Sequence, residues 1–141
     1  MCIIFLRRKL ADIGNTVRMQ FNQLSRWATL VTVHSISGFG ILEGIKNAES
    51  YSLEMGVFMV AELSSKNNLI SPDYTKETVE LSKNYPQVVV GFVSQSSVCD
   101  DPGSIQLTPG VCLGESVKND LLGQQYRNPE TIKMVPISRY Y

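Results

Sequence analysis

The chain has 141 residues, and its 13 Lys+Arg balance 13 Asp+Glu, so the formal net charge is zero. Apolar residues make up 43% of the chain, enough to drive collapse, which excludes intrinsic disorder. Zero net charge argues against nucleic acids and anionic membranes as partners, because no basic field attracts phosphates at long range.

Five short runs rich in β-branched and other apolar residues are predicted to be buried strands, at residues 3–6, 30–34, 57–63, 88–94 and 105–111. Three segments with helical spacing lie between them, at residues 15–27, 39–48 and 71–83. In the first of these, the spacing places Val17, Met19, Phe21, Leu24 and Trp27 near one side.

The third helix has a clear start signal. Ser71 is the expected cap, Pro72 suits the first turn, and Asp73 is favoured there by the helix dipole.

This alternation of strand and helix predicts one α/β unit with parallel strands and right-handed crossovers. Either an open doubly wound sheet or part of a (β/α)₈ TIM barrel fits it. Each predicted strand after the first ends in polar residues, among them His34, Glu62, Ser64, Gln95 and Thr108. No GxGxxG turn follows the first strand, so the polar strand ends favour a partial barrel of about five parallel strands.

Two polar clusters stand out. In residues 7–16, Lys9 and Asp12 are expected to lie close enough to pair, either as a buried proton donor held by a carboxylate or as an exposed ion pair. In residues 122–127, Gly123 permits close backbone approach and Gln124, Tyr126 and Arg127 can donate to phosphate oxygens, although a polar surface loop has the same composition.

In order along the chain, six motifs resemble the orotidine 5'-monophosphate decarboxylase family. They are KLADIGNT at 9–16, AELSSK at 61–66, DYT at 73–75, VGFV at 90–93, LTPGV at 107–111 and LGQQY at 122–126. The resemblance implies a (β/α)₈ barrel acting as a homodimer, which converts orotidine 5'-monophosphate (OMP) to UMP in de novo pyrimidine biosynthesis without cofactor or metal. A cytoplasmic location is also expected, because Cys2, Cys99 and Cys112 are widely spaced and form no CxxC pair.

The resemblance assigns the catalytic residues to the first cluster. Lys9 matches the lysine that protonates C6 of the pyrimidine. Asp12 matches the second aspartate of the family's charge array and Thr16 a ribose-contacting threonine, and in this family both reach into the partner subunit's site.

The substrate-binding residues come from three later motifs. Ser64 matches the serine that hydrogen-bonds the pyrimidine, and Pro109 lines the pocket. Gln124 and Tyr126 match the residues that link base and phosphate. His34 is expected to be packed and hydrogen-bonded rather than catalytic.

Some features depart from the family. Arg7 stands where the family has its first aspartate, and Asn67 where it usually has glycine. A complete barrel needs about 200–250 residues, so residues 1–133 are predicted to be the central part of a barrel domain truncated at both ends, followed by a divergent tail at 134–141. We therefore expect impaired catalysis.

Two alternatives remain from the sequence. One is a non-catalytic nucleotide-binding fragment or pseudoenzyme that pairs with a full-length subunit. The other is a different phosphosugar enzyme on a related barrel.

Overall fold

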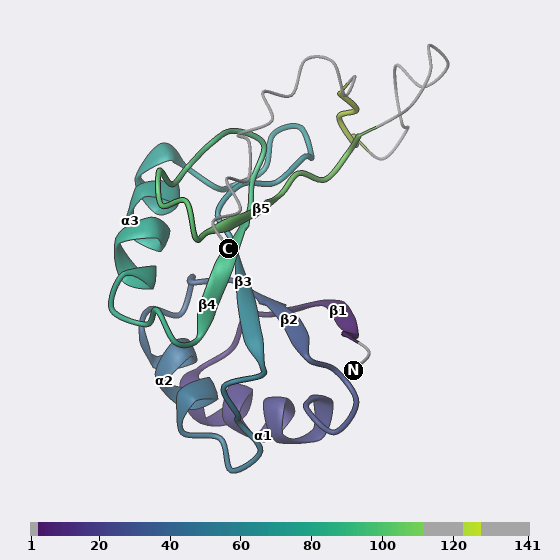
Figure 1. Cartoon of the computed structure of the whole chain (residues 1–141). Helices are drawn as coiled ribbons and strands as arrows, with labels where there is room; N and C mark the ends of the chain where they lie inside the picture. The colour runs from purple at the N-terminus through teal and green to yellow at the C-terminus, as the bar shows by residue number, and fades with distance from the viewer. Residues whose placement is uncertain (1–2, 112–122, 128–141) are drawn as a thin grey trace.

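The computed structural model describes residues 3–111 and 123–127. Strands and helices alternate in this part of the chain except at its end, where two strands follow each other (Figure 1). In order they are β1 (Phe5–Leu10), α1 (Gly14–Leu24), β2 (Leu30–Val33), α2 (Gly40–Lys46), β3 (Gly56–Val60), α3 (Pro72–Ser82), β4 (Val89–Val93) and β5 (Ile105–Leu107). The boundary predicted at residue 133 and the tail beyond it lie outside the described residues. Within those residues, no helix is both long and apolar enough to cross a membrane.

The five strands form one sheet in the order β1-β2-β3-β4-β5, and every neighbouring pair is parallel. A doubly wound sheet reverses its strand order at a switch point, whereas this sheet winds in one direction throughout. With right-handed crossovers, such winding puts all helices on one side, as Figure 1 shows for α1, α2 and α3. The predicted α/β fold with part of a (β/α)₈ barrel is therefore confirmed.

The two faces of the sheet are buried to different extents. The helix-covered face holds the main core, in which Val31 and Val33 of β2 and Met59 of β3 pack against α1 and α2 residues such as Phe21 and Ile41. The opposite face, which becomes the inside of a closed barrel, carries a smaller cluster of Phe58, Val60 and Val93 with partly buried neighbours. Strand residues alternate between these two environments, as the pleat requires.

The start of α3 follows the predicted signals. The Ser71 Oγ accepts a hydrogen bond from Tyr74 N at 3.1 Å, Pro72 occupies the first turn, and Asp73 is the acidic residue there. The fully buried residue of α3 is Thr78. Its hydroxyl bonds the Ser35 hydroxyl after β2, so a polar pair ties α3 to the sheet.

The predictions for four elements need correction. The first strand runs from Phe5 to Leu10 rather than over residues 3–6, because it pairs with β2 despite its charged residues. β3 and β5 end before the polar tails that were included in their predicted ranges. Met19 and Trp27 are 53% and 52% exposed, so α1 buries only Val17 and Phe21 fully.

Backbone contact brings α1 and α2 together. A Cβ at Gly14 would meet the carbonyl oxygen of Gly40, and a Cβ at Gly44 would meet the carbonyl oxygen of Gly14, each at 2.2 Å. Neither position has room for a side chain. The beginning of α1 is thus fixed against α2 by two glycines.

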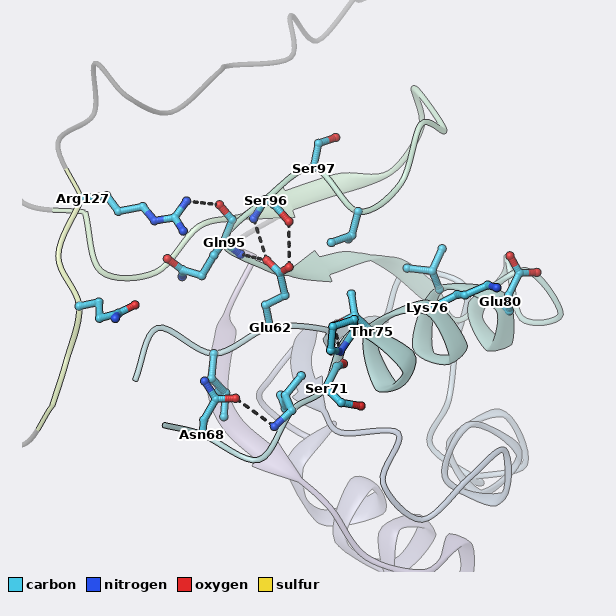
Figure 2. Close-up of a pocket in the computed structure, with 16 residues that line it drawn as sticks. Glu62, Asn68, Ser71, Thr75, Lys76, Glu80, Gln95, Ser96, Ser97 and Arg127 are labelled. Atoms are coloured by element: carbon cyan, nitrogen blue, oxygen red, sulfur yellow. Dashed lines mark hydrogen bonds between the residues drawn. The ribbon is translucent and has the colours of Figure 1, made fainter. Parts of the chain in front are cut away.

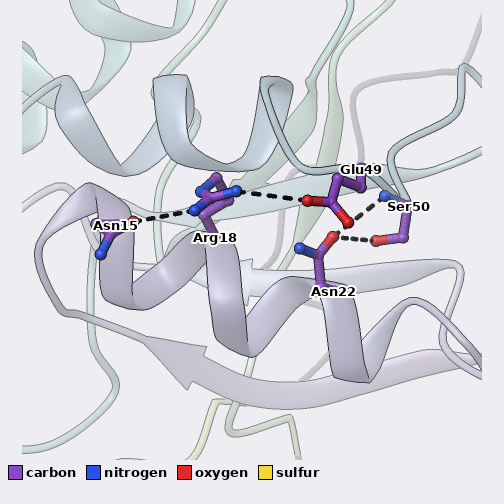
Figure 3. A network of polar contacts seen from close by, with 5 residues as sticks. All are labelled: Asn15, Arg18, Asn22, Glu49 and Ser50. Carbon is purple, nitrogen blue, oxygen red and sulfur yellow. Dashed lines mark hydrogen bonds and ion pairs between the residues drawn. The ribbon is translucent and has the colours of Figure 1, made fainter.

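A polar network extends this contact toward the far end of α1 (Figure 3). The Arg18 guanidinium donates to Asn15 Oδ1 at 3.2 Å and forms an ion pair with Glu49 Oε1 at 3.9 Å. Asn22 Oδ1 accepts from the Ser50 amide at 3.1 Å and from its hydroxyl at 2.8 Å. The loop after α2 is therefore held along the length of α1.

Replacing Gly44 with alanine should destabilise the fold by about 1–3 kcal/mol, because the new methyl group overlaps a backbone oxygen that cannot move alone. Gly40→Ala is the matched control on the same helix, since its Cβ finds nothing nearer than Gly14 N at 3.9 Å. Urea denaturation of both variants measures the difference. Equal stability of the two variants would contradict the tight crossing.

Candidate functional site

The carboxyl ends of the parallel strands meet along one edge of the sheet, where α/β proteins bind their ligands. β1 contributes Lys9 there. A bulge at Arg7 and Arg8 separates the pairs Leu6↔Val31 and Lys9↔Thr32. Leu10 is buried under the helices, so Lys9, its exposed neighbour, lies on the inner face of the sheet.

The predicted Lys9–Asp12 pair is not formed. The ion pairs among the described residues are Arg18–Glu49 and Lys83–Glu80. The Asp12 carboxylate instead accepts the amide of Ile13 at 2.7 Å. Asp12 is exposed and lies just before α1, whereas Thr16 is half-buried in the first turn of that helix. Both therefore lie at the same end of the sheet as Lys9.

His34, at the end of β2, is packed and hydrogen-bonded as predicted. Its Nδ1 lies 3.4 Å from the Tyr74 hydroxyl of α3, and that hydroxyl accepts from Ser35 N at 3.0 Å. Burial lowers the pKa of the His34 imidazole below its ordinary value, and the positive charge of Lys9 lowers it further. A neutral histidine therefore stands beside Lys9 at neutral pH.

Three predicted binding residues converge at the ends of β3 and β5. Gln124 Nε2 donates to the buried Ser64 Oγ at 2.6 Å. The backbone of this segment pairs with the residues around Ser64, with Gln125 N bonded to Ser64 O at 2.8 Å. On its other side, Arg127 N bonds Gly110 O at 2.8 Å, which brings Pro109 alongside.

Gly110 is required at this junction. Its φ is +75°, and a Cβ there would lie 2.4 Å from Gln125 O and 2.7 Å from Gln124 Nε2. Only glycine combines this conformation with such a close approach. Tyr126 follows on the same segment and is 40% exposed.

A second hydrogen-bond cluster lies next to these residues (Figure 2). The Glu62 carboxylate accepts the amides of Gln95 and Ser96 at 2.5 and 2.7 Å and the Ser96 hydroxyl at 2.8 Å. Gln95 Nε2 donates to Pro109 O at 3.1 Å, and Arg127 Nη1 donates to Gln95 O at 2.6 Å. Arg127, expected to suit phosphate, thus binds a backbone carbonyl here.

This cluster borders a cavity of about 640 Å³ between α3 and the loops after β3 and β4, with Lys76 and Thr75 on its helical wall. None of the seven predicted site residues lines it. Lys9, Asp12 and Tyr126 among them are exposed, whereas Ser64 is buried. The polar strand ends predicted Glu62 and Gln95 as members of the edge, but their contacts depend on loop geometry that spacing does not reveal.

Asn67 has the left-handed conformation that a glycine adopts readily, with φ of +54°. Asparagine tolerates this region better than other non-glycine residues do. The replacement of the family's usual glycine is therefore compatible with the same loop shape. Among the described residues, no group of three or more His, Cys, Asp or Glu could hold a metal ion.

Parallel strands wound in one direction, with polar residues gathered at their carboxyl ends, define part of a (β/α)₈ barrel protein. Residues 1–140 match the model of the orotidine 5'-phosphate decarboxylase / HUMPS family. The chain belongs to this family.

Curated relatives agree with the family match. Orotidine 5'-phosphate decarboxylase of Saccharomycopsis fibuligera is 40% identical over 134 residues, covering 89% of this chain and 50% of the relative. The enzyme of the same name from Kodamaea ohmeri is 43% identical over 134 residues, covering 89% and 51%. The chain spans about half the length of these relatives.

Solved structures show the same fold. Orotidine 5'-phosphate decarboxylase from Lactobacillus acidophilus matches with a TM-score of 0.55 at 21% identity, covering 78% of this chain and 58% of that one. An uncharacterized conserved protein from Geobacillus kaustophilus matches with a TM-score of 0.50 at 27% identity, covering 65% and 49%.

The pKa of His34 should be measurable directly, because it is the only histidine of the chain. NMR titration of its imidazole should give a pKa below 6.5. Since the folded pKa lies below the unfolded one, the neutral imidazole contributes stability above pH 6.5, and that contribution falls as the pH drops from there toward the folded pKa.

The variant Lys9→Gln should raise this pKa by removing a neighbouring positive charge. Lys83→Gln is the control, because that lysine pairs with Glu80 on α3. A His34 pKa at or above 6.5 in the unaltered chain would show that the imidazole is not held neutral.

Proposed function

We propose that this chain carries part of an active site for the decarboxylation of OMP to UMP, in de novo pyrimidine biosynthesis, and binds the pyrimidine nucleotide itself. Ser64, Pro109, Gln124 and Tyr126 are the proposed binding residues. The observation that carries the proposal is the 2.6 Å hydrogen bond between Gln124 Nε2 and Ser64 Oγ. This bond joins Ser64, which is assigned to the pyrimidine base, to Gln124, which is assigned to link base and phosphate.

In the proposed chemistry, the carboxylate at C6 of the pyrimidine leaves as CO₂ and negative charge develops on C6. A cation beside C6 stabilises that charge and then supplies the proton. Lys9 is the proposed donor, supported by its place on the inner face of β1. The neutral state of His34 keeps a second positive charge from competing with Lys9 for the same position.

Arg7 opposes full activity in this scheme. Replacing the family's first aspartate with a cation favours binding of the substrate carboxylate and removes an anion that destabilises it. Arg7 favours the second candidate function, which is a non-catalytic nucleotide-binding module that pairs with a full-length subunit. Both readings share the nucleotide pocket, and they differ in turnover.

We further propose that a second copy of the chain, or of its full-length form, covers the surface around Asp12. Ile13, Ile36 and Phe39 are 64%, 69% and 65% exposed there. The Ser37 hydroxyl donates to Asp12 O at 2.7 Å, which brings their two loops together into one apolar surface. Burying this surface would carry Asp12 and Thr16 toward the partner subunit's site.

UMP at about 100 times its dissociation constant should stabilise the chain by roughly 2.7 kcal/mol and raise the midpoint of a thermal melt. Gln124→Ala should abolish most of this increase, because it removes a donor from the proposed pocket. Gln23→Ala, on the exposed side of α1, is the control. A melt that UMP leaves unmoved would contradict the proposal.

The same preparation should be assayed for UMP formation from OMP. Turnover above the uncatalysed rate supports the enzyme, whereas UMP binding without turnover supports the non-catalytic module.

Phe39→Glu should shift the chain from dimer to monomer, because it places a charge in the surface proposed to be buried. Leu53→Glu is the control: Leu53 is 84% exposed but precedes β3, at the opposite end of the sheet. Sedimentation velocity measures both. A monomeric unaltered chain, or a Phe39→Glu variant that remains dimeric, would exclude this interface.

A further inference from the structure

We propose that Glu62 is a positioning residue for the nucleotide-binding segment, acting through Gln95 on Pro109 and on residues 123–127. This inference rests on the proposed function and adds three residues to it: Glu62, Gln95 and Arg127. None of them is among the residues to which the family resemblance assigns a role.

The first step is the way Glu62 holds the turn after β4. One carboxylate oxygen, Oε2, accepts the amides of both Gln95 and Ser96, and Oε1 accepts the Ser96 hydroxyl at 2.8 Å. Hydrogen bonds to a carboxylate are shorter and stronger than those between neutral groups. Within the described part of the chain, Glu62 takes part in no ion pair, so its partners are these donors of the turn.

The second step runs from Gln95 to the binding segment. Gln95 is fixed at three points: its amide by Glu62, its carbonyl by Arg127 Nη1 at 2.6 Å, and its side chain by Pro109 O at 3.1 Å. Arg127 in turn donates its own amide to Gly110 O at 2.8 Å. Figure 2 shows Glu62, Gln95, Ser96 and Arg127 directed toward one another.

The two steps form a continuous path of hydrogen bonds from the end of β3 to the segment that carries Gln124 and Tyr126. Two side chains anchor that segment, Gln124 on Ser64 Oγ and Arg127 on the Gln95 carbonyl, and the second anchor lies on the turn after β4. Holding it ready for the nucleotide therefore depends on the turn that Glu62 fixes. Loss of Glu62 would leave two amide donors of that turn without their acceptor.

The test compares Glu62→Ala with Glu62→Gln. The glutamine can still accept the two amides through its oxygen, and its NH₂ group can donate to the Ser96 hydroxyl, so it retains the geometry without the charge. Glu80→Ala is the matched control, because Glu80 borders the same cavity but pairs with Lys83.

The first measurement needs no ligand. Amide hydrogen exchange at Gln125 and Arg127, whose N–H groups bond Ser64 O and Gly110 O, should become about tenfold faster or more in Glu62→Ala. Glu62→Gln and Glu80→Ala should stay close to the unaltered chain. The Val57 amide, bonded to Val88 O in the core, is the internal reference for global unfolding.

The second measurement is UMP affinity. Glu62→Ala should weaken UMP affinity about tenfold, whereas Glu62→Gln should keep it within about threefold of the unaltered chain. The effect of Glu62→Ala should vanish in a Gln124→Ala background, because both changes act on one segment. If the unaltered chain fails to bind UMP, the proposed function fails while the exchange result still decides the positioning role.

Unchanged exchange at Gln125 and Arg127 in Glu62→Ala would overturn the inference, as would Glu62→Gln behaving like Glu62→Ala. If Glu62→Ala does not fold, Arg127→Met carries the test from the other end of the path. It should speed exchange at the same amides without unfolding the core, and no change there would equally overturn the inference.

Discussion

Single-direction winding of a parallel sheet is the constraint on which the rest of this structure depends. Because successive strands are neighbours and parallel crossovers are right-handed, the three helices of residues 3–111 cover one face, and the carboxyl ends of the strands open on one edge. The main core belongs to the covered face. The inner face is left to a small apolar cluster and to the polar residues that follow each strand.

The edge of the sheet divides into two parts with different physical character. Toward β1, Lys9 and Asp12 are exposed and are joined by no ion pair, so this part consists of charges on an open surface. Toward β5, Ser64, Gln124 and Pro109 lie within a dense set of hydrogen bonds. Recognition of a nucleotide needs preorganised donors, which the second part offers. The proposed chemistry needs a charge array, of which Lys9 and Asp12 in the first part are the proposed members.

Local signals in the sequence predicted much of this arrangement. Apolar runs located the strands, and Ser71 marked the start of α3, because both effects act within a few residues. The strand at Phe5–Leu10 was misjudged because its arginines and lysine suggest a loop, while pairing with β2 outweighs their low β-propensity. The contacts of Glu62 and of Gln95 together join three loops that are distant in sequence, and no periodicity encodes them.

The bulge in β1 determines which face of the sheet Lys9 takes in this chain. Arg7 and Arg8 lie between the residues that pair with Val31 and Thr32, which are consecutive in β2. Because the insertion has an even number of residues, Leu6 and Leu10 stay on the helix side of the sheet and Lys9 stays on the other side. Loss or gain of a single residue at this point would exchange the faces of everything on one side of it, and Lys9 would turn toward the helices. An insertion or deletion of two residues here would keep Lys9 on the inner face, whereas a change of one residue would not.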